Sequence, residues 1–237
     1  MQLPVVLNQP PVWKNFSVAE RDLNWAAANK LVESLQNLNE SGLHAVQTVI
    51  GGRTFVEWDH YPDDDVRDDK NASQYFYHAH PGLQRPFVEH GHFHLFVHAE
   101  SLGLRKKNSR FEPAPAHLVA VSMNAIGMPS GFFTVNRWVT KGPWLSFKEC
   151  EIGLKHFKIA AKHGKKDVNV FLQSLVQLYY QKILALLRQR DEIMEKLCDG
   201  RDRRSVFADE QIEVLCYTPI DIMEDIAALE ELMESNS

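Results

Sequence analysis

The chain has 237 residues, with 26 Lys and Arg against 31 Asp and Glu, so its formal net charge is −5. This length fits one domain of ordinary size, and the mild acidity does not favour nucleic acid as a partner. Cys150, Cys198 and Cys216 are too far apart for a Cys-x-x-Cys motif and suit reduced thiols. Gln and Lys interrupt the apolar stretch 168–187, and Pro interrupts the N-terminus, so we expect neither a membrane span nor a secretory signal. A cytoplasmic protein is the simplest expectation.

The first regular element is predicted to be a long helix over residues 17–41. Ser17 can cap it, and Glu20 three residues later completes a capping box. Apolar residues then recur on one face of the helix, and Gly42 is suited to its C-terminal cap. We therefore expect this helix to pack on another element, whereas residues 1–15 are expected to be irregular.

Between about residues 44 and 140 the pattern favours strands. Runs rich in β-branched and aromatic residues alternate with turns that contain Gly and Pro, and no long helical pattern intervenes. The short connections predict an antiparallel sheet of about six strands. The predicted strands cover 44–50, 53–58, 74–80, 90–98, 117–124 and 131–140, with an acidic, solvated loop over 59–69.

The remainder is predicted to be mainly helical, with helices over 146–163 and 167–197, a short strand over 211–217 and a last helix that begins at Thr218-Pro219-Ile220-Asp221. The apolar stripe of 168–187 suits core packing or a homodimer interface. The sequence thus predicts one α+β domain with N-terminal and C-terminal helices packed on one face of the sheet. Its parts are the N-terminal helix 17–41, the His-rich antiparallel sheet 44–140 and the mainly helical part 146–237 of a single domain 1–237.

Histidine is the unusual feature of the composition. Six of the 11 His lie within 21 residues, at positions 78, 80, 90, 92, 94 and 98. Side chains alternate between the two faces of a strand, so His90, His92 and His94 are expected on one face. In the preceding strand His78 and His80 share a face in the same way. If the two strands pair, their imidazoles lie side by side.

This arrangement predicts a metal site, because imidazole is the commonest side-chain metal ligand near neutral pH. Histidines two residues apart on a strand can share an ion, whereas those four apart are separated by roughly 13 Å. His90 and His94 are therefore not expected to share one ion. We expect two of His90, His92 and His94 to bind it together with His78, His80 or both, and we place His98 outside the site.

The predicted cofactor is a divalent metal, zinc or iron(II). Three protein ligands and an open position would activate water for hydrolysis, and iron would activate oxygen. We assign catalytic roles to Glu89 and His92, since Glu89 can add a carboxylate or hold the second nitrogen of a ligand. Arg137 and Trp138 are candidates to bind a small-molecule substrate, with an anionic group at Arg137. A non-catalytic metal or haem binder remains an alternative.

The segment His90-Gly91-His92-Phe93-His94-Leu95-Phe96 also resembles the motif of the histidine-triad nucleotide hydrolases and transferases. That resemblance implies His92 as the nucleophile toward phosphate, with His90 and His94 assisting it. Gly91 departs from the family pattern, and His78 and His80 have no place in it.

Four strings within about residues 55–145 resemble an uncharacterised bacterial family of unknown function. This resemblance supports the boundaries of the sheet and implies no reaction. The strings are Trp58-Asp59-His60-Tyr61-Pro62, Ser73-Gln74-Tyr75-Phe76-Tyr77-His78-Ala79-His80, Glu89–His94 and Asn136-Arg137-Trp138-Val139-Thr140.

Overall fold

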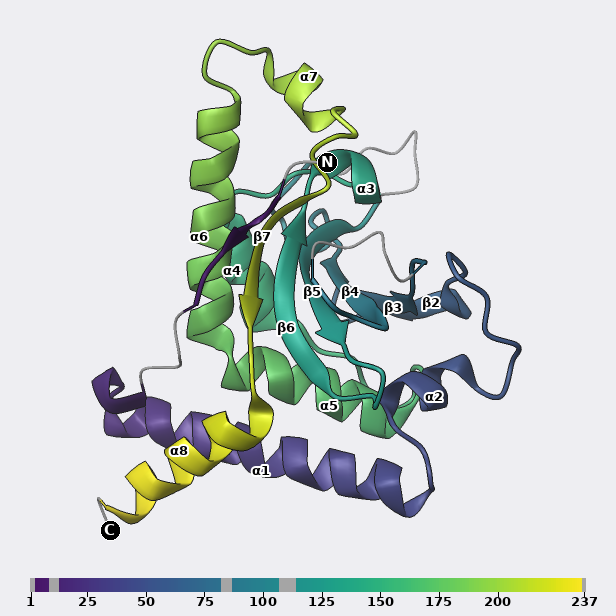
Figure 1. Ribbon diagram of the computed structural model, residues 1–237, viewed down its shortest axis with the longest axis vertical. Helices are drawn as coiled ribbons and strands as arrows, with labels where there is room; N and C mark the ends of the chain where they lie inside the picture. The colour runs from purple at the N-terminus through teal and green to yellow at the C-terminus, as the bar shows by residue number, and fades with distance from the viewer. Residues whose placement is uncertain (1–2, 9–12, 82–86, 107–113, 236–237) are drawn as a thin grey trace.

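A computed structural model describes residues 3–8, 13–81, 87–106 and 114–235. Its centre is a sheet of seven strands within these residues, in the order β1-β7-β6-β5-β4-β3-β2 (Figure 1). The mainly antiparallel sheet is confirmed; the one parallel pair described is β1 with β7. The strands are β1 (Val5–Val6), β2 (Tyr61–Asp68), β3 (Ser73–His78), β4 (Gly91–Val97), β5 (Ala116–Met123), β6 (Pro129–Val135) and β7 (Val214–Pro219).

Eight α-helices are described, and the first begins as the sequence predicts. Ser17 and Glu20 form the expected capping box, in which each side chain pairs with the backbone of the other residue. The helices are α1 (Val18–Glu40), α2 (Ala45–Ile50), α3 (Arg137–Thr140), α4 (Phe147–His156), α5 (Lys166–Leu178), α6 (Tyr180–Leu197), α7 (Arg203–Phe207) and α8 (Ile222–Glu234), with a 3-10 turn at Trp13–Asn15.

The helix predicted over 167–197 is two helices, because α5 and α6 meet at Tyr179 with a bend of 72°. Among the described residues, no single helix has the length and apolar character of a membrane span, and only the bent pair taken together meets that description. Tyr179 donates a hydrogen bond to Asp225 of α8 across 2.7 Å, which ties the bend to the last helix.

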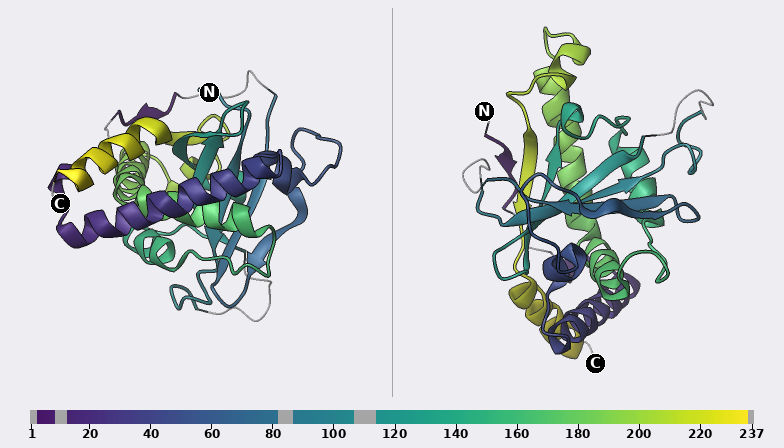
Figure 2. Two further views of the ribbon diagram at one scale, coloured as in Figure 1. Left: turned by 90° about the horizontal axis from the view of Figure 1, so that it is seen from below. Right: turned by 90° about the vertical axis from the view of Figure 1, so that its right-hand side faces the viewer.

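One face of the sheet packs against the helices. Phe93 of β4 lies against Phe171 of α5, and Phe132 of β6 lies against Tyr179. The N-terminal helix α1 packs chiefly on α5 and so forms an outer layer rather than lying directly on the sheet (Figures 1 and 2). The sequence had placed both sets of helices on the sheet itself.

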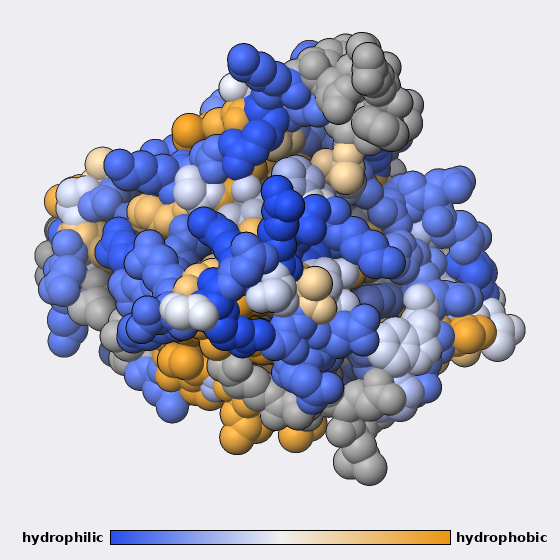
Figure 3. Space-filling model, turned by 90° about the horizontal axis from the view of Figure 1, so that it is seen from above, coloured by the Kyte–Doolittle hydropathy of each residue, from blue (hydrophilic) through white to orange (hydrophobic). Residues whose placement is uncertain are grey.

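The opposite face carries a smaller apolar cluster and the histidines. Ala120, Phe133, Val135 and Val214 are buried there, and Val139 of α3 packs against them. Around this framework, the surface seen from above is mostly hydrophilic, with apolar residues in small separate groups (Figure 3).

Two elements on the N-terminal side of the sheet differ from the sequence prediction. The segment 44–50 is helix α2 rather than a strand, because His44 Nδ1 accepts from the Gln47 amide and the Gln47 side chain accepts from the amide of His44. Gly51 then ends the helix in the left-handed conformation, and 53–58 forms no strand. These caps stabilise a short helix despite its β-branched residues.

The acidic segment 59–69, predicted as a solvated loop, contains strand β2. Asp68 is fully buried, and its carboxylate accepts from the backbone amides of Asn71 and Ala160. Paired in this way, a carboxylate is tolerated inside the protein. The acidic composition therefore predicted a solvated loop where the structure has a strand.

Four smaller predictions also need correction. Residues 137–140 form helix α3 rather than the end of a strand, and the helix predicted over 146–163 ends at His156. Pro219 belongs to β7 while Asp221 caps α8. Val5–Val6, expected to be irregular, adds an edge strand.

Candidate metal centre

Three histidines converge on the face of the sheet away from the helices. His92 of β4 is directly opposite His78 of β3 in the strand register, and His94 follows two residues along β4. Strand alternation puts all three side chains on one face. The sequence predicted this use of two neighbouring strands, and the structure brings together three of the five histidines that it named.

The three rings direct their Nε2 atoms to one point. The His92 Nε2 atom lies 2.7 Å from that of His78 and 3.1 Å from that of His94, and the three ligand atoms all lie within 4.8 Å of one another. Nitrogen ligands of a tetrahedral zinc ion, each at about 2.1 Å from the metal, are roughly 3.4 Å apart. The group therefore needs only small adjustments to hold an ion.

Glu89 sets the proton position on His92. Its Oε1 atom lies 2.9 Å from His92 Nδ1, and its Oε2 atom accepts from the Ser122 hydroxyl at 2.8 Å. A carboxylate only accepts hydrogen bonds, so Nδ1 donates and a neutral His92 keeps a lone pair on Nε2. This carboxylate–histidine pair is the usual second partner of a metal-binding imidazole.

His94 has an equivalent partner in His117, which the sequence did not single out. His94 Nδ1 lies 3.0 Å from His117 Nε2. Burial and the Arg190 guanidinium lower the pKa of His117 to about 3, so its imidazole is neutral at pH 7. It can accept the Nδ1 proton of His94 and leave the His94 Nε2 lone pair directed at His92.

A β-bulge places His117 on this face. Leu95 pairs with Val119 but the next residue, Phe96, pairs with His117, so β5 has one extra residue, Leu118. With a regular register, His117 would oppose Val97 and point toward the helices. The alternation rule cannot reveal such an insertion, which explains why sequence reasoning missed this residue.

The centre is largely removed from water. His92 and His94 are 0% and 1% exposed, while His78 is half-buried. Phe133 packs edge-on against His92, and Phe76 lies 5.2 Å from His94 between ring centroids. Such a setting strengthens electrostatic interactions, so lone pairs that face one another require a proton or a cation between them.

The other two predicted ligands lie outside the converging group. The His80 ring stacks beside His92 with 5.3 Å between ring centroids, and the Trp58 ring packs edge-on against His80. His90 precedes β4, so strand alternation does not apply to it; its Nδ1 lies 2.6 Å from the Tyr77 hydroxyl, on the helix-covered side. His80 is therefore a neighbour of the centre, whereas His90 is directed away from it.

The polar residues beside the centre are held by their own hydrogen bonds. His98, placed outside the site by the sequence, contacts Gln74 Oε1 at 2.9 Å, and Gln74 donates to Asp65 at 2.7 Å. Asp65 also contacts His60, whose ring stacks on Phe76. This row of hydrogen-bonded side chains borders the three histidines on the side nearest β2.

The predicted substrate residues lie at the end of β6, in helix α3. The Trp138 indole donates to the carbonyl of Ile212 at 2.8 Å, which holds it against the segment between α7 and β7. Arg137 is exposed, and it lines a small cavity together with His117 and Arg190. Arg137 and His117 thus border the same small cavity, and substrate binding by Arg137 or Trp138 remains a prediction.

Residues 25–220 match a domain of unknown function, DUF6969. The chain belongs to this family. The match confirms membership of an uncharacterised family and gives no support to the histidine-triad resemblance, whose His90 also turns away from His92 and His94. No curated protein and no solved structure matches the DUF6969 chain.

Proposed function

We propose that this DUF6969 protein is a metal-dependent enzyme. It binds one divalent metal ion through the Nε2 atoms of His78, His92 and His94. The observation that supports this most directly is the convergence of the three Nε2 atoms. In two of the rings, His92 and His94, the other nitrogen, Nδ1, already has a hydrogen-bond partner. Glu89 and His117 are then positioning residues, since each holds a ligand without reaching the ion.

Zinc is the first choice of metal. Three imidazole ligands with a position left open are a recognised catalytic zinc arrangement, whereas non-haem iron oxygenases more often combine two histidines with a carboxylate. In this centre the carboxylate of Glu89 contacts His92 Nδ1 and is not one of the three converging groups. Iron(II) remains the runner-up, with oxygen activation as its chemistry.

The proposed reaction class is hydrolysis of a small-molecule substrate. A zinc ion held by these three imidazoles would lower the pKa of a bound water to about 7 and would polarise a carbonyl or phosphoryl oxygen. The protein residues contribute by excluding solvent: Phe76 and Phe133 pack beside the ligands. Arg137 is the candidate to attract an anionic substrate.

Elemental analysis of the purified chain tests this proposal. We expect close to one zinc per chain, loss of that zinc in His78→Ala, and retention in the matched variant His80→Ala, because His80 lies beside the ligands without joining them. Metal-free protein from a metal-replete medium would reject the proposal. Equal zinc loss in both variants would reject the assignment of ligands, and a Soret band would indicate a haem binder instead.

A further inference from the structure

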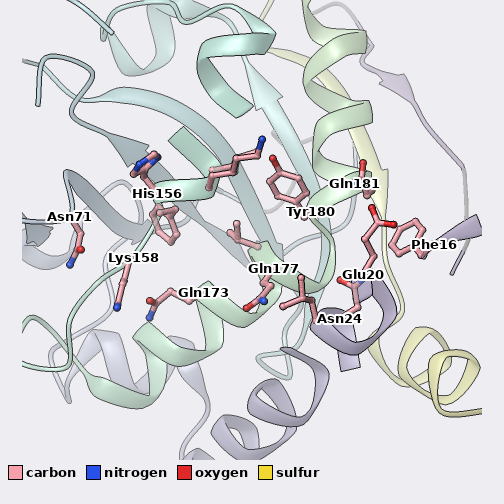
Figure 4. Close-up of a pocket in the computed structure, with 15 residues that line it drawn as sticks. Phe16, Glu20, Asn24, Asn71, His156, Lys158, Gln173, Gln177, Tyr180 and Gln181 are labelled. Atoms are coloured by element: carbon pink, nitrogen blue, oxygen red, sulfur yellow. The ribbon is translucent and has the colours of Figure 1, made fainter. Parts of the chain in front are cut away.

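The cleft among the helices does not lead to the proposed metal ion. Helices α1, α5 and α6 and the end of α4 line this cleft, whose volume is about 680 Å³ (Figure 4). Two of its polar side chains are already engaged within the chain. Glu20 accepts from Ser17, and the Gln173 amide donates to the carbonyls of Ile159 and Asn169. The three histidines lie on the other face of the sheet, so the substrate of the metal centre needs a site on that face.

The half-buried ligand His78 marks the side from which a substrate reaches the proposed metal ion, because the two ligands on β4 are almost fully buried. Two further rings stand perpendicular to the His78 ring. The centroid of His60 lies 5.8 Å from that of His78, and the centroid of His80 lies 4.8 Å from it. Trp58 packs edge-on against His80 at 4.1 Å between centroids. His60, His80 and Trp58 therefore form an aromatic rim beside the exposed side of the centre.

Trp58 is the member of this rim with the largest open surface. It is 54% exposed, although Trp has the largest side chain and is usually well buried. It belongs to the exposed segment 51–60, which connects α2 to β2. Half of its aromatic surface thus remains in water and gives up the stabilisation that burial of a ring provides. A ligand packed on the Trp58 ring would recover part of that free energy.

The backbone of Trp58 has a conformation that disfavours a large side chain. Its φ is 74°, in the left-handed region that Gly, Asn and Asp adopt most readily. The Trp58 amide donates to the carbonyl of Ala79 at 2.9 Å, which holds the residue beside the end of β3. Glycine would occupy this position without strain, so the indole is present at a conformational cost. Strain of this kind is concentrated at sites that bind ligands.

We propose that Trp58 is a specificity-determining residue of the metal centre, and that the substrate carries an aromatic ring that packs on the Trp58 indole. This inference rests on the proposed function, because the reacting group of the substrate has to lie at the metal ion. Only one ring separates Trp58 from a ligand, since His80 stacks on His92 with 5.3 Å between centroids. Aromatic pairs are stabilised beyond the burial of their area, whereas a saturated ring gains only the burial. The rim therefore favours a planar aromatic group over a saturated one.

Binding of two hydroxamates to the zinc-loaded full chain, measured by calorimetry, tests this inference. Benzohydroxamate and cyclohexanecarbohydroxamate share the group that binds zinc and have rings of similar size, but only the first ring is aromatic. We expect the ratio of their affinities to favour benzohydroxamate, and to fall about fivefold in Trp58→Asn. Asn tolerates a positive φ, so this variant should keep its fold and its zinc.

Two further variants sharpen the comparison. Trp58→Phe retains an aromatic ring and should keep most of the preference for benzohydroxamate. Phe55→Leu is the matched control, because Phe55 lies in the same exposed segment but stacks on Tyr61. This control should leave the affinity ratio unchanged.

An affinity ratio that Trp58→Asn leaves unchanged would overturn the inference, and so would an equal fall of the ratio in Phe55→Leu. Either result would leave the metal centre as proposed, because both hydroxamates would still bind to the zinc. A chain that binds neither zinc nor hydroxamate would reject the proposed function, and this inference with it. The two failures are therefore distinguished in one set of titrations.

Discussion

His117 Nε2 lies 3.0 Å from His94 Nδ1, although the two residues occupy neighbouring strands whose regular register would keep them on opposite faces. The extra residue of the β5 bulge brings them together. Bulges beside functional sites often redirect one side chain, and here the redirected side chain supports a ligand of the proposed metal ion.

The first prediction concerns this contact. His117→Phe should weaken zinc binding by about 10- to 100-fold, the usual effect of removing the second partner of a ligand, because the His94 ring loses the acceptor that orients it. Competition with a chromogenic chelator measures the affinity. His156→Gln is the matched control, since His156 is exposed, lies away from the centre and hydrogen-bonds the carbonyl of Ile152 on its own helix. Unchanged affinity in His117→Phe would show that the contact is incidental.

The second prediction concerns Glu89. Glu89→Gln keeps the shape of the side chain but removes the negative charge beside His92 Nδ1, so zinc affinity should fall by about 10-fold or more. Ser122→Ala, which removes only the hydroxyl that donates to Glu89, should have a smaller effect. The same competition assay ranks the two variants, and the reverse order would contradict the role given to the carboxylate.

The third prediction links metal binding to stability. Zinc at about 100 times its Kd should raise the free energy of unfolding by about 2.7 kcal/mol, because it binds the folded chain. Urea unfolding with zinc and with a chelator measures the difference. The difference should vanish in His92→Ala, and a zinc effect that survives in this variant would place the ion elsewhere.

The fourth prediction concerns acid stability away from the centre. Burial alone would raise the pKa of Glu149, but hydrogen bonds from the Arg105 side chain and from Ser146 outweigh it and lower the pKa to about 2. A carboxyl group whose pKa is lower in the folded chain than in the unfolded chain stabilises the fold at pH values above its unfolded pKa. For Glu149 this contribution is at most about 3 kcal/mol, and it is lost as the pH falls from about 4.5 toward 2.

Urea unfolding between pH 2 and pH 7 measures this dependence. Glu149→Gln should flatten the fall in stability over that window. Glu151→Gln lies on the same helix but removes only the exposed pair with Lys155, so it should keep the dependence of the unmodified chain. Identical profiles for all three proteins would mean that Glu149 has no part in acid unfolding.

The sequence predicted the part of the site that depends on strand alternation. His78, His92 and His94 were placed on one face of two neighbouring strands, and the structure puts them there. His90 does not join the converging group, because it lies outside β4, where alternation no longer holds. His117 was missed because a bulge, which depends on tertiary packing, reverses its direction.

The fold follows the same division. The capping box at Ser17 is a local signal and was read correctly. The sequence predicted a strand in place of helix α2, because the β-branched residues of this segment favour strands. The helix forms because His44 and Gly51 cap its two ends. Strand β2 was hidden by its aspartates, since the partners that allow Asp68 to be buried come from the distant segment around Ala160.

A crystal structure of the zinc-soaked protein, with anomalous diffraction recorded at the zinc edge, tests the central claim most directly. The account predicts one strong peak about 2.1 Å from the Nε2 atoms of His78, His92 and His94. A map without a peak at this position, or with the zinc bound by other residues, would contradict it.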